Sequence, residues 1–121
     1  MSVTRFEDLE CWKKAKALAV ELYQISNNGE FGKDFGFKDQ VRRAAVSIAS
    51  NIAEGKERET VAEFIRYLFI AKGSAGELKT QVLIAADIGY VSPERAQDLR
   101  VKVETLSAML GALIKKLRSR R

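Results

Sequence analysis

The sequence predicts an all-α protein, an antiparallel up-down-up-down four-helix bundle in a single domain over residues 1–121. Apolar residues recur at helical spacing in four segments, at about residues 5–27, 37–54, 61–88 and 93–118. The length of 121 residues fits one domain. The one proline stands between two of these segments, and no useful strand alternation occurs. Short connections favour antiparallel neighbours.

The first predicted helix opens with a capping box, Thr4-Arg5-Phe6-Glu7, in which each end residue can satisfy a free amide of the other. It should stop at Asn27-Asn28-Gly29, because Asn and Gly tolerate the left-handed backbone of a helix end. Residues 29–37 contain three glycines and are expected to form the one long loop. Three aromatic side chains should hold this loop to the bundle: Phe31, Phe35 and Phe37.

The other helices also carry start and stop signals. The second helix is expected to end with Gly55 as its C-terminal cap. The third should begin at a second capping box that opens with Thr60. The fourth begins with Ser92 as a cap and Pro93 in the first helical position. Its apolar seam alternates steps of four and three: Leu99, Val103, Leu106, Leu110, Leu113 and Leu117.

The third helix predicts self-association, because it is apolar on nearly every side. Only Arg66 is strongly polar within residues 64–71, and only Asp87 within residues 82–88. Its neighbours in a small bundle cannot cover such a helix, whereas a second subunit can. Two helical glycines imply either a closely packed backbone or a bend, and the sequence leaves both open. The predicted interface residues are Phe64, Tyr67, Phe69, Gly73 and Gly76.

The formal net charge of +5 comes entirely from the C-terminus. Residues 115–121 hold five cations and no anion, while the rest of the chain is balanced. One or two cations would be enough to stabilise the end of a helix. The excess favours phosphate contacts, and a solubilising role is the alternative. The candidate nucleic-acid contacts are Arg42, Arg43, Lys56, Arg58, Lys115, Lys116, Arg118, Arg120 and Arg121.

A polar stripe marks the second helix, where Arg43, Ser47, Asn51 and Glu54 fall on neighbouring angles. We interpret it as a hydrogen-bonded seam that fixes the register of packing. A recognition surface for phosphate or a partner is the alternative.

The sequence lacks the residues on which most catalysis depends. It has no histidine, and its single cysteine, Cys11, cannot build a structural zinc site. We therefore predict no catalytic, metal-binding or cofactor-binding residues, and a protein that is not an enzyme. One thiol, an already charged N-terminus and no apolar run long enough for a membrane span favour a cytoplasmic protein.

The stretch Arg42–Gly55, RRAAVSIASNIAEG, resembles the signature of the 23S rRNA intervening-sequence protein family. Phe6-Glu7-Asp8-Leu9 with Trp12-Lys13-Lys14-Ala15 is similar to the opening of that family, and Phe64 to Tyr90 is similar to its third helix. The family often has proline where this chain has Ala49, so its second helix should be straighter here.

This resemblance implies a four-helix bundle that assembles as a ring-like homopentamer. Some members are encoded within 23S rRNA genes, and the family name records this location without demonstrating rRNA binding. The family is also similar to the accessory variability determinant of diversity-generating retroelements, a basic pentameric bundle that works with a reverse transcriptase and nucleic acid. The sequence thus favours a non-enzymatic homo-oligomeric module, with RNA, DNA or a nucleic-acid-handling protein as partner. The alternative is a structural protein–protein scaffold.

Overall fold

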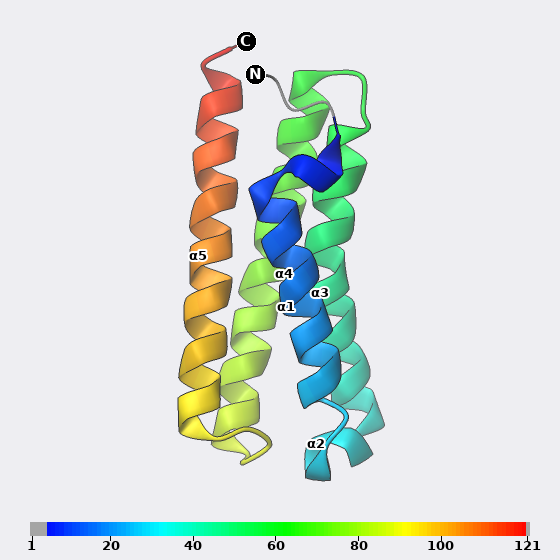
Figure 1. Cartoon of the computed structure of the whole chain (residues 1–121), viewed down its shortest axis with the longest axis vertical. Coiled ribbons are helices and arrows are strands. Elements are labelled where there is room, and N and C mark those ends of the chain that lie inside the picture. The colour runs from blue at the N-terminus through cyan, green and yellow to red at the C-terminus, as the bar shows by residue number, and fades with distance from the viewer. Residues whose placement is uncertain (1–4, 121) are drawn as a thin grey trace.

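In the computed structural model, which describes residues 5–120, the chain is all-α and its helices pack against one another (Figure 1). No strand occurs in that range. A short 3-10 turn precedes five helices: η1 Phe6–Asp8, α1 Glu10–Ile25, α2 Gly29–Lys33, α3 Phe35–Lys56, α4 Val61–Asp87 and α5 Pro93–Arg118. The ring-like assembly expected from the sequence stays a prediction.

The four long helices run alternately up and down the molecule, and the C-terminus lies at the same end as the α3–α4 turn (Figure 1). Helix α4 packs chiefly against α3 and α5, while α1 packs against α3 and more weakly against α5. Helices α1 and α4 overlap in the view of Figure 1 but lie diagonally across the bundle. One face of the bundle is therefore formed by α1 and α3 side by side, and the opposite face by α4 and α5.

The core is a column of aliphatic side chains from all four long helices. Leu22, Ile48, Leu68 and Leu110 are each at most 1% exposed. The predicted seam of α5 is buried except at Leu113, which is half-buried beside the fully packed Ile114. Burial of such side chains stabilises the fold by about 1.5–3 kcal/mol each.

The first helix begins later than predicted. Phe6–Asp8 form a 3-10 turn, and α1 starts at Glu10 after an extended Leu9 that makes no side-chain cap. The edge-to-face contact of Phe6 with Trp12, 5.2 Å between ring centroids, folds this turn back onto α1. The expected cap at Thr4 lies outside the described residues. The helix also ends at Ile25, short of the predicted residue 27.

The predicted loop at residues 29–37 is instead a short helix and the first residues of α3. Gly29 has a positive φ of 56°, which lets the chain turn sharply between α1 and α2. Asp34 then caps α3 by accepting a hydrogen bond from the Phe37 backbone N–H at 3.1 Å. Phe31 and Phe37 pack onto the bundle as predicted, whereas Phe35 is 73% exposed. Aromatic packing against Tyr90, in the α4–α5 connection, overrides the flexibility that three glycines suggest.

Gly55 does not cap α3, which continues to Lys56. The residue is buried because α4 crosses it closely: a Cβ at this position would lie 2.7 Å from the Cβ of Tyr67 and 3.2 Å from the Phe64 carbonyl oxygen. Close packing of two helices therefore explains this glycine. Caps at Thr60 and Ser92 are present, accepting from the Glu63 and Arg95 amides at 3.1 Å. No helix over residues 5–120 is long and apolar enough to cross a membrane.

Candidate nucleic-acid interface

One end of the bundle gathers six of the nine predicted nucleic-acid contacts. The α3–α4 turn, with Lys56 and Arg58, lies at the same end as the last turns of α5 (Figure 1). We call this region the cationic end and define it by its basic residues: Lys56, Arg58, Lys115, Lys116, Arg118 and Arg120. Arg121 lies outside the described residues.

The cations of α5 are exposed and available. Lys115, Lys116, Arg118 and Arg120 are all exposed, and none pairs with a carboxylate of residues 5–120. Helix α5 continues through Arg118, and the Ser119 hydroxyl donates to the Lys116 carbonyl oxygen at 2.7 Å. The guanidinium of Arg118 lies 5.2 Å from the ring centroid of Phe69 on α4. Three of these charges, Lys115, Lys116 and Arg118, therefore lie on the last turns of α5, and Arg120 follows in the turn after the helix.

Arg58 is engaged within the chain. Its guanidinium donates to the Tyr67 hydroxyl and lies 3.6 Å from Glu54 and 3.9 Å from Glu63. The two carboxylates offset its charge, so it adds little to the field at this end. Lys56 is half-buried.

Arg42 and Arg43 lie apart from the cationic end, although the sequence analysis grouped them with its residues as candidate nucleic-acid contacts. From Arg43 to Lys56, α3 rises by roughly 20 Å at 1.5 Å per residue. Arg42 donates to the Ser26 hydroxyl at 2.8 Å and to the Tyr23 carbonyl oxygen at 3.1 Å, closing the end of α1. Arg43 pairs with Asp39 at 2.8 Å. Such tertiary contacts leave no sequence signal, because the partners of Arg42 are 16 and 19 residues away.

The polar stripe of α3 is divided. Asn51 donates to both the carbonyl oxygen and the hydroxyl of Ser47, at 2.8 and 3.0 Å, and the Ser47 and Ser74 hydroxyls bond at 2.8 Å. This seam joins α3 to α4. Arg43 and Glu54 take no part in it, since each is exposed: Arg43 pairs with Asp39 on α3, and Glu54 pairs with Arg58 in the α3–α4 turn.

The predicted interface residues have two different environments. Phe64 and Tyr67 pack inside the chain, against Gly55. Phe69 is 45% exposed, and a Cβ built on Gly73 or Gly76 would meet nothing within 4 Å. Other apolar side chains on the outer surface of α4 are also exposed: Ile70, Leu83, Ile84 and Ile88. Helix α4 thus has an outer face with exposed apolar side chains that residues 5–120 leave uncovered.

A largely apolar groove of about 510 Å³ runs between α1 and α3. Its lining includes three exposed apolar side chains, Val20, Tyr23 and Val46, with the small Ala49 and Ala53. The sequence did not indicate this groove, because it arises only where two helices meet. Because α1 and α4 are diagonal, the groove faces away from the outer face of α4.

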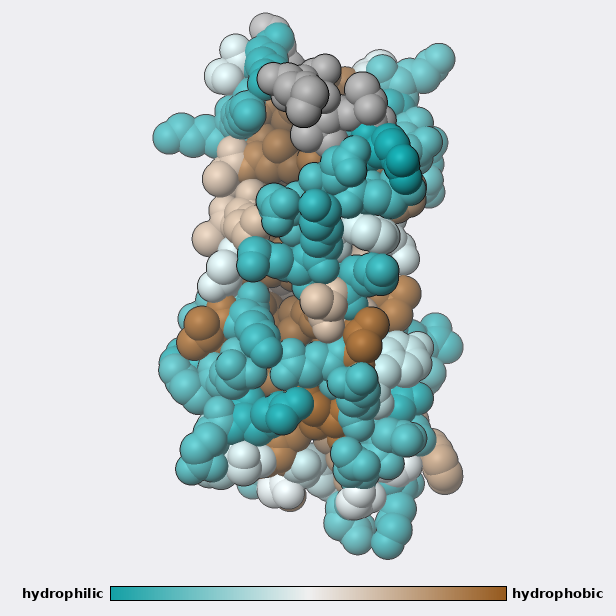
Figure 2. Space-filling model, viewed as in Figure 1, coloured by the Kyte–Doolittle hydropathy of each residue, from teal (hydrophilic) through white to brown (hydrophobic). Residues whose placement is uncertain are grey.

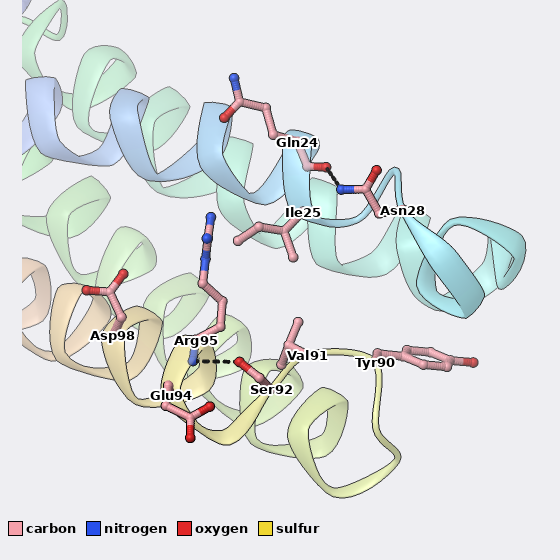
Figure 3. A pocket seen from close by; sticks show the side chains of 9 residues that line it. All are labelled: Gln24, Ile25, Asn28, Tyr90, Val91, Ser92, Glu94, Arg95 and Asp98. Carbon is pink, nitrogen blue, oxygen red and sulfur yellow. Dashed lines mark hydrogen bonds between the residues drawn. The ribbon is translucent and has the colours of Figure 1, made fainter.

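The opposite end of the bundle contains a polar groove of about 640 Å³ between the end of α1 and the start of α5 (Figure 3). Arg95 extends across it toward α1 and pairs with Glu21 at 3.3 Å. Glu94 and Asp98 stand beside Arg95, so the charge there is mixed. The surface of the molecule on the side seen in Figure 1 is also mostly hydrophilic, with apolar patches between the polar side chains (Figure 2).

Outside these surfaces, the ionisable groups with a shifted pKa include the buried Cys11 and the hydrogen-bonded pair of Tyr90 and Asp34. Burial raises the pKa of the Cys11 thiol above its usual value, which disfavours the reactive thiolate. The Tyr90 hydroxyl donates to Asp34 at 2.6 Å; with the Phe37 amide, it lowers the pKa of that carboxyl. Over residues 5–120, no group of three His, Cys, Asp or Glu could hold a metal ion.

Comparison with known proteins identifies relatives of this fold. Residues 7–112 match the family model of the 23S rRNA-intervening sequence protein. The structure is similar to the crystal structure of a protein of unknown function from the S23 ribosomal protein family of Bacteroides thetaiotaomicron. That alignment has a TM-score of 0.80 and 25% sequence identity over 87% of this chain and 98% of the other. A search of curated proteins found no match. The matched residues end before Lys115, so the cationic tail lies beyond the family match.

Proposed function

This chain belongs to the 23S rRNA-intervening sequence protein family, and from this premise we propose that it is a non-enzymatic, homo-oligomeric module that binds nucleic acid through its cationic end. The partner is RNA or DNA, free or held in a ribonucleoprotein. The observation that carries the proposal is the set of four exposed cations at the end of α5 and just after it, which have no carboxylate partners among residues 5–120. Phosphate groups would pair with them and release counterions.

The number of these cations exceeds what folding requires. A helix C-terminus is stabilised by nearby positive charge at about 0.3–1 kcal/mol per group, and the effect fades within the last turn. Nine of the sixteen cations before Lys115 pair with a carboxylate, as with Arg43 and Arg58, whereas none of the four described cations from Lys115 onward does. A cluster left unpaired at one end creates a local positive potential that attracts polyanions.

Self-association is proposed to use the outer face of α4 and the groove between α1 and α3. The exposed Ile70 and Ile84 would enter the groove of a second copy, and Gly73 would allow close approach of the helices. Since the face and the groove are different surfaces, this contact is heterologous, and repeated contacts form a ring if the rotation closes. A pentamer would bring five cationic ends together.

The test of binding measures affinity for a fluorescent RNA and a DNA of the same sequence at about 50 and 200 mM salt. The variant K115Q/K116Q/R118Q spares the buried Leu117, and K33Q/K38Q/R43Q is the control with equal charge change at the other end. We expect the first variant to reduce the slope of log affinity against log salt by about 2–3, since each phosphate contact contributes about 0.7–0.9. Equal slopes for the two variants would contradict the proposal.

The test of assembly measures molecular mass by light scattering. Ile84→Glu places a charge on the outer face of α4, where Ile84 is 44% exposed. The control, Val101→Glu, places a charge on α5, where Val101 is similarly exposed at 47%. We expect the wild type to be an oligomer and only Ile84→Glu to lower the mass. A wild-type monomer at micromolar concentration would overturn the assembly.

A structural protein–protein scaffold is the second candidate, favoured by the apolar groove between α1 and α3. In that case the chain would bind no nucleic acid at low salt. Capture of a protein partner would be unchanged in K115Q/K116Q/R118Q and lost when Val46 in the groove is replaced by Glu.

A further inference from the structure

A groove between α4 and α5 is lined by two lysines, Lys72 and Lys79, and by one carboxylate, Glu104. It has a volume of about 390 Å³, and small residues line it, among them Ala75, Gly76 and Ala108. Two contacts cross it, Lys79 to Glu104 at 2.8 Å and Lys72 to Ser107 at 3.1 Å. A third contact between the same two helices, Arg118 over Phe69 at 5.2 Å, lies beyond the groove toward the cationic end. The groove itself extends along α5 from Val103 to Ala108, and Arg118 lies about three turns further along the same helix.

Positive charge exceeds negative charge along this groove. Lys79 and Arg100 share one carboxylate, Glu104, at 2.8 and 3.5 Å. Lys72 has no carboxylate partner among residues 5–120: its ammonium donates to the carbonyl oxygen and hydroxyl of Ser107, both at 3.1 Å, and retains a third donor. We define the basic groove by the two lysines that line it, Lys72 and Lys79, together with three cations of α5 that lie beyond its two ends, Arg100, Lys115 and Arg118.

The spacing of these cations along α5 repeats by whole turns. From Arg100 to Arg118 is 18 residues, which is five turns of a helix, so both lie on one face. The same interval spans about 27 Å at 1.5 Å per residue, comparable to about eight nucleotides of a stacked strand at 3.4 Å each.

We propose that the basic groove binds the phosphate backbone of a single nucleic-acid strand, with Lys72 and Lys79 as contacts beyond the cationic end. This inference rests on the proposed function and specifies the class of nucleic acid. Packed helices lie about 8–10 Å apart, which leaves a groove suited to one strand and too narrow for a duplex. The half-exposed Phe69 under Arg118 provides an aromatic surface for base stacking between the groove and the cationic end.

The experiment compares a 12-nucleotide single strand with a 12-base-pair duplex of the same sequence. The variant K72Q/K79Q is measured beside K13Q/K14Q, which removes equal charge from exposed positions of α1, diagonally opposite α4. We expect K72Q/K79Q to bind the single strand at least tenfold more weakly at about 100 mM salt, with a salt slope reduced by about 1.4, from two contacts of about 0.7 each. The variant K13Q/K14Q should match the wild type.

Two further measurements separate charge from folding and test the length of the site. K72R/K79R should restore most of the affinity, and circular dichroism should show equal helix content in every variant. Affinity should rise with strand length up to about eight nucleotides and then level off.

The outcomes distinguish this inference from the proposed function. If K115Q/K116Q/R118Q weakens binding while K72Q/K79Q matches K13Q/K14Q, the groove is not used and the cationic end still is. Tighter binding of the duplex than of the single strand also overturns the inference. Absence of wild-type binding to either probe at low salt overturns both proposals.

Discussion

The two ends of the bundle use their polar and aromatic residues differently. At the end formed by α2 and the α4–α5 connection, Phe31 packs against Phe37 and Tyr90, with ring centroids 5.6 and 5.3 Å apart. The Tyr90 hydroxyl bonds to Asp34, which also caps α3. At the cationic end, Lys115, Lys116, Arg118 and Arg120 remain exposed without carboxylate partners among residues 5–120. One end therefore stabilises the fold, while the other presents charge to the solvent.

The largest effect is expected at the aromatic end. Phe31→Ala should lower the free energy of unfolding by about 3–5 kcal/mol, because a ring only 2% exposed leaves a cavity among Phe37 and Tyr90. Urea denaturation measures the loss. Phe35→Ala is the control, since that ring is 73% exposed and its removal should change stability by about 0.5 kcal/mol or less. Similar losses in both variants would refute the difference between these rings.

The next effect tests the closeness of α3 and α4 near the cationic end. Gly55→Ala should cost about 1–3 kcal/mol, because the new methyl group would lie 2.7 Å from the Cβ of Tyr67 and must push the helices apart. Gly73→Ala, at a helical position with open space, should instead raise the stability of the single chain by up to about 1 kcal/mol. Thermal melting of both variants in the monomeric Ile84→Glu background measures this contrast. A neutral Gly55→Ala would show that the two helices can separate freely.

A pH-dependent effect on stability is expected at the aromatic end. The pKa of Asp34 is lowered mainly by the Tyr90 hydroxyl and also by the Phe37 amide. Its contribution to stability is therefore complete above the unfolded-state pKa of about 3.9 and is lost as the pH falls through the lower folded-state pKa. Tyr90→Phe should reduce stability at neutral pH and flatten its decline below about pH 4. Equal pH profiles of unfolding for the variant and the wild type would count against this coupling.

The smallest effect on stability is expected at the cationic end. K115Q/K116Q/R118Q should change the free energy of unfolding by about 1 kcal/mol in total, because these side chains are exposed and interact mainly with the helix dipole. The same variant should strongly weaken nucleic-acid binding. A loss of stability as large as that of Phe31→Ala would mean that the tail serves the fold.

The sequence predicted the helices best where signals were local. The cap at Thr60 and the Ser92-Pro93 start of α5 depend on neighbouring residues alone, and both are present. The predictions from the sequence were wrong where contacts between distant residues determined the local structure. Residues 29–37 form α2 and the start of α3, because Phe31 packs against Tyr90. Gly55 lies buried within α3, because Tyr67 of α4 packs directly over it.

The candidate site follows the same division. The tail cations were evident from composition, but Arg42 could not be separated from them until its hydrogen bonds to Ser26 and Tyr23 were known. Lys72 and Lys79 gave no sequence signal, since their significance comes from lying beside α5. Phe64 and Tyr67 are half-buried and pack against Gly55, and their predicted contact with another subunit stays a prediction.

By itself, the sequence determined the all-α class, the start signals of α4 and α5, and the location of the excess charge. These features depend on the order of residues along the chain, through helical periodicity, caps and charge count. Only the tertiary structure decided which cations share one end, which aromatic rings are buried, and where grooves form between helices. Each of these depends on distances between residues far apart in the chain, which packing of the helices alone establishes.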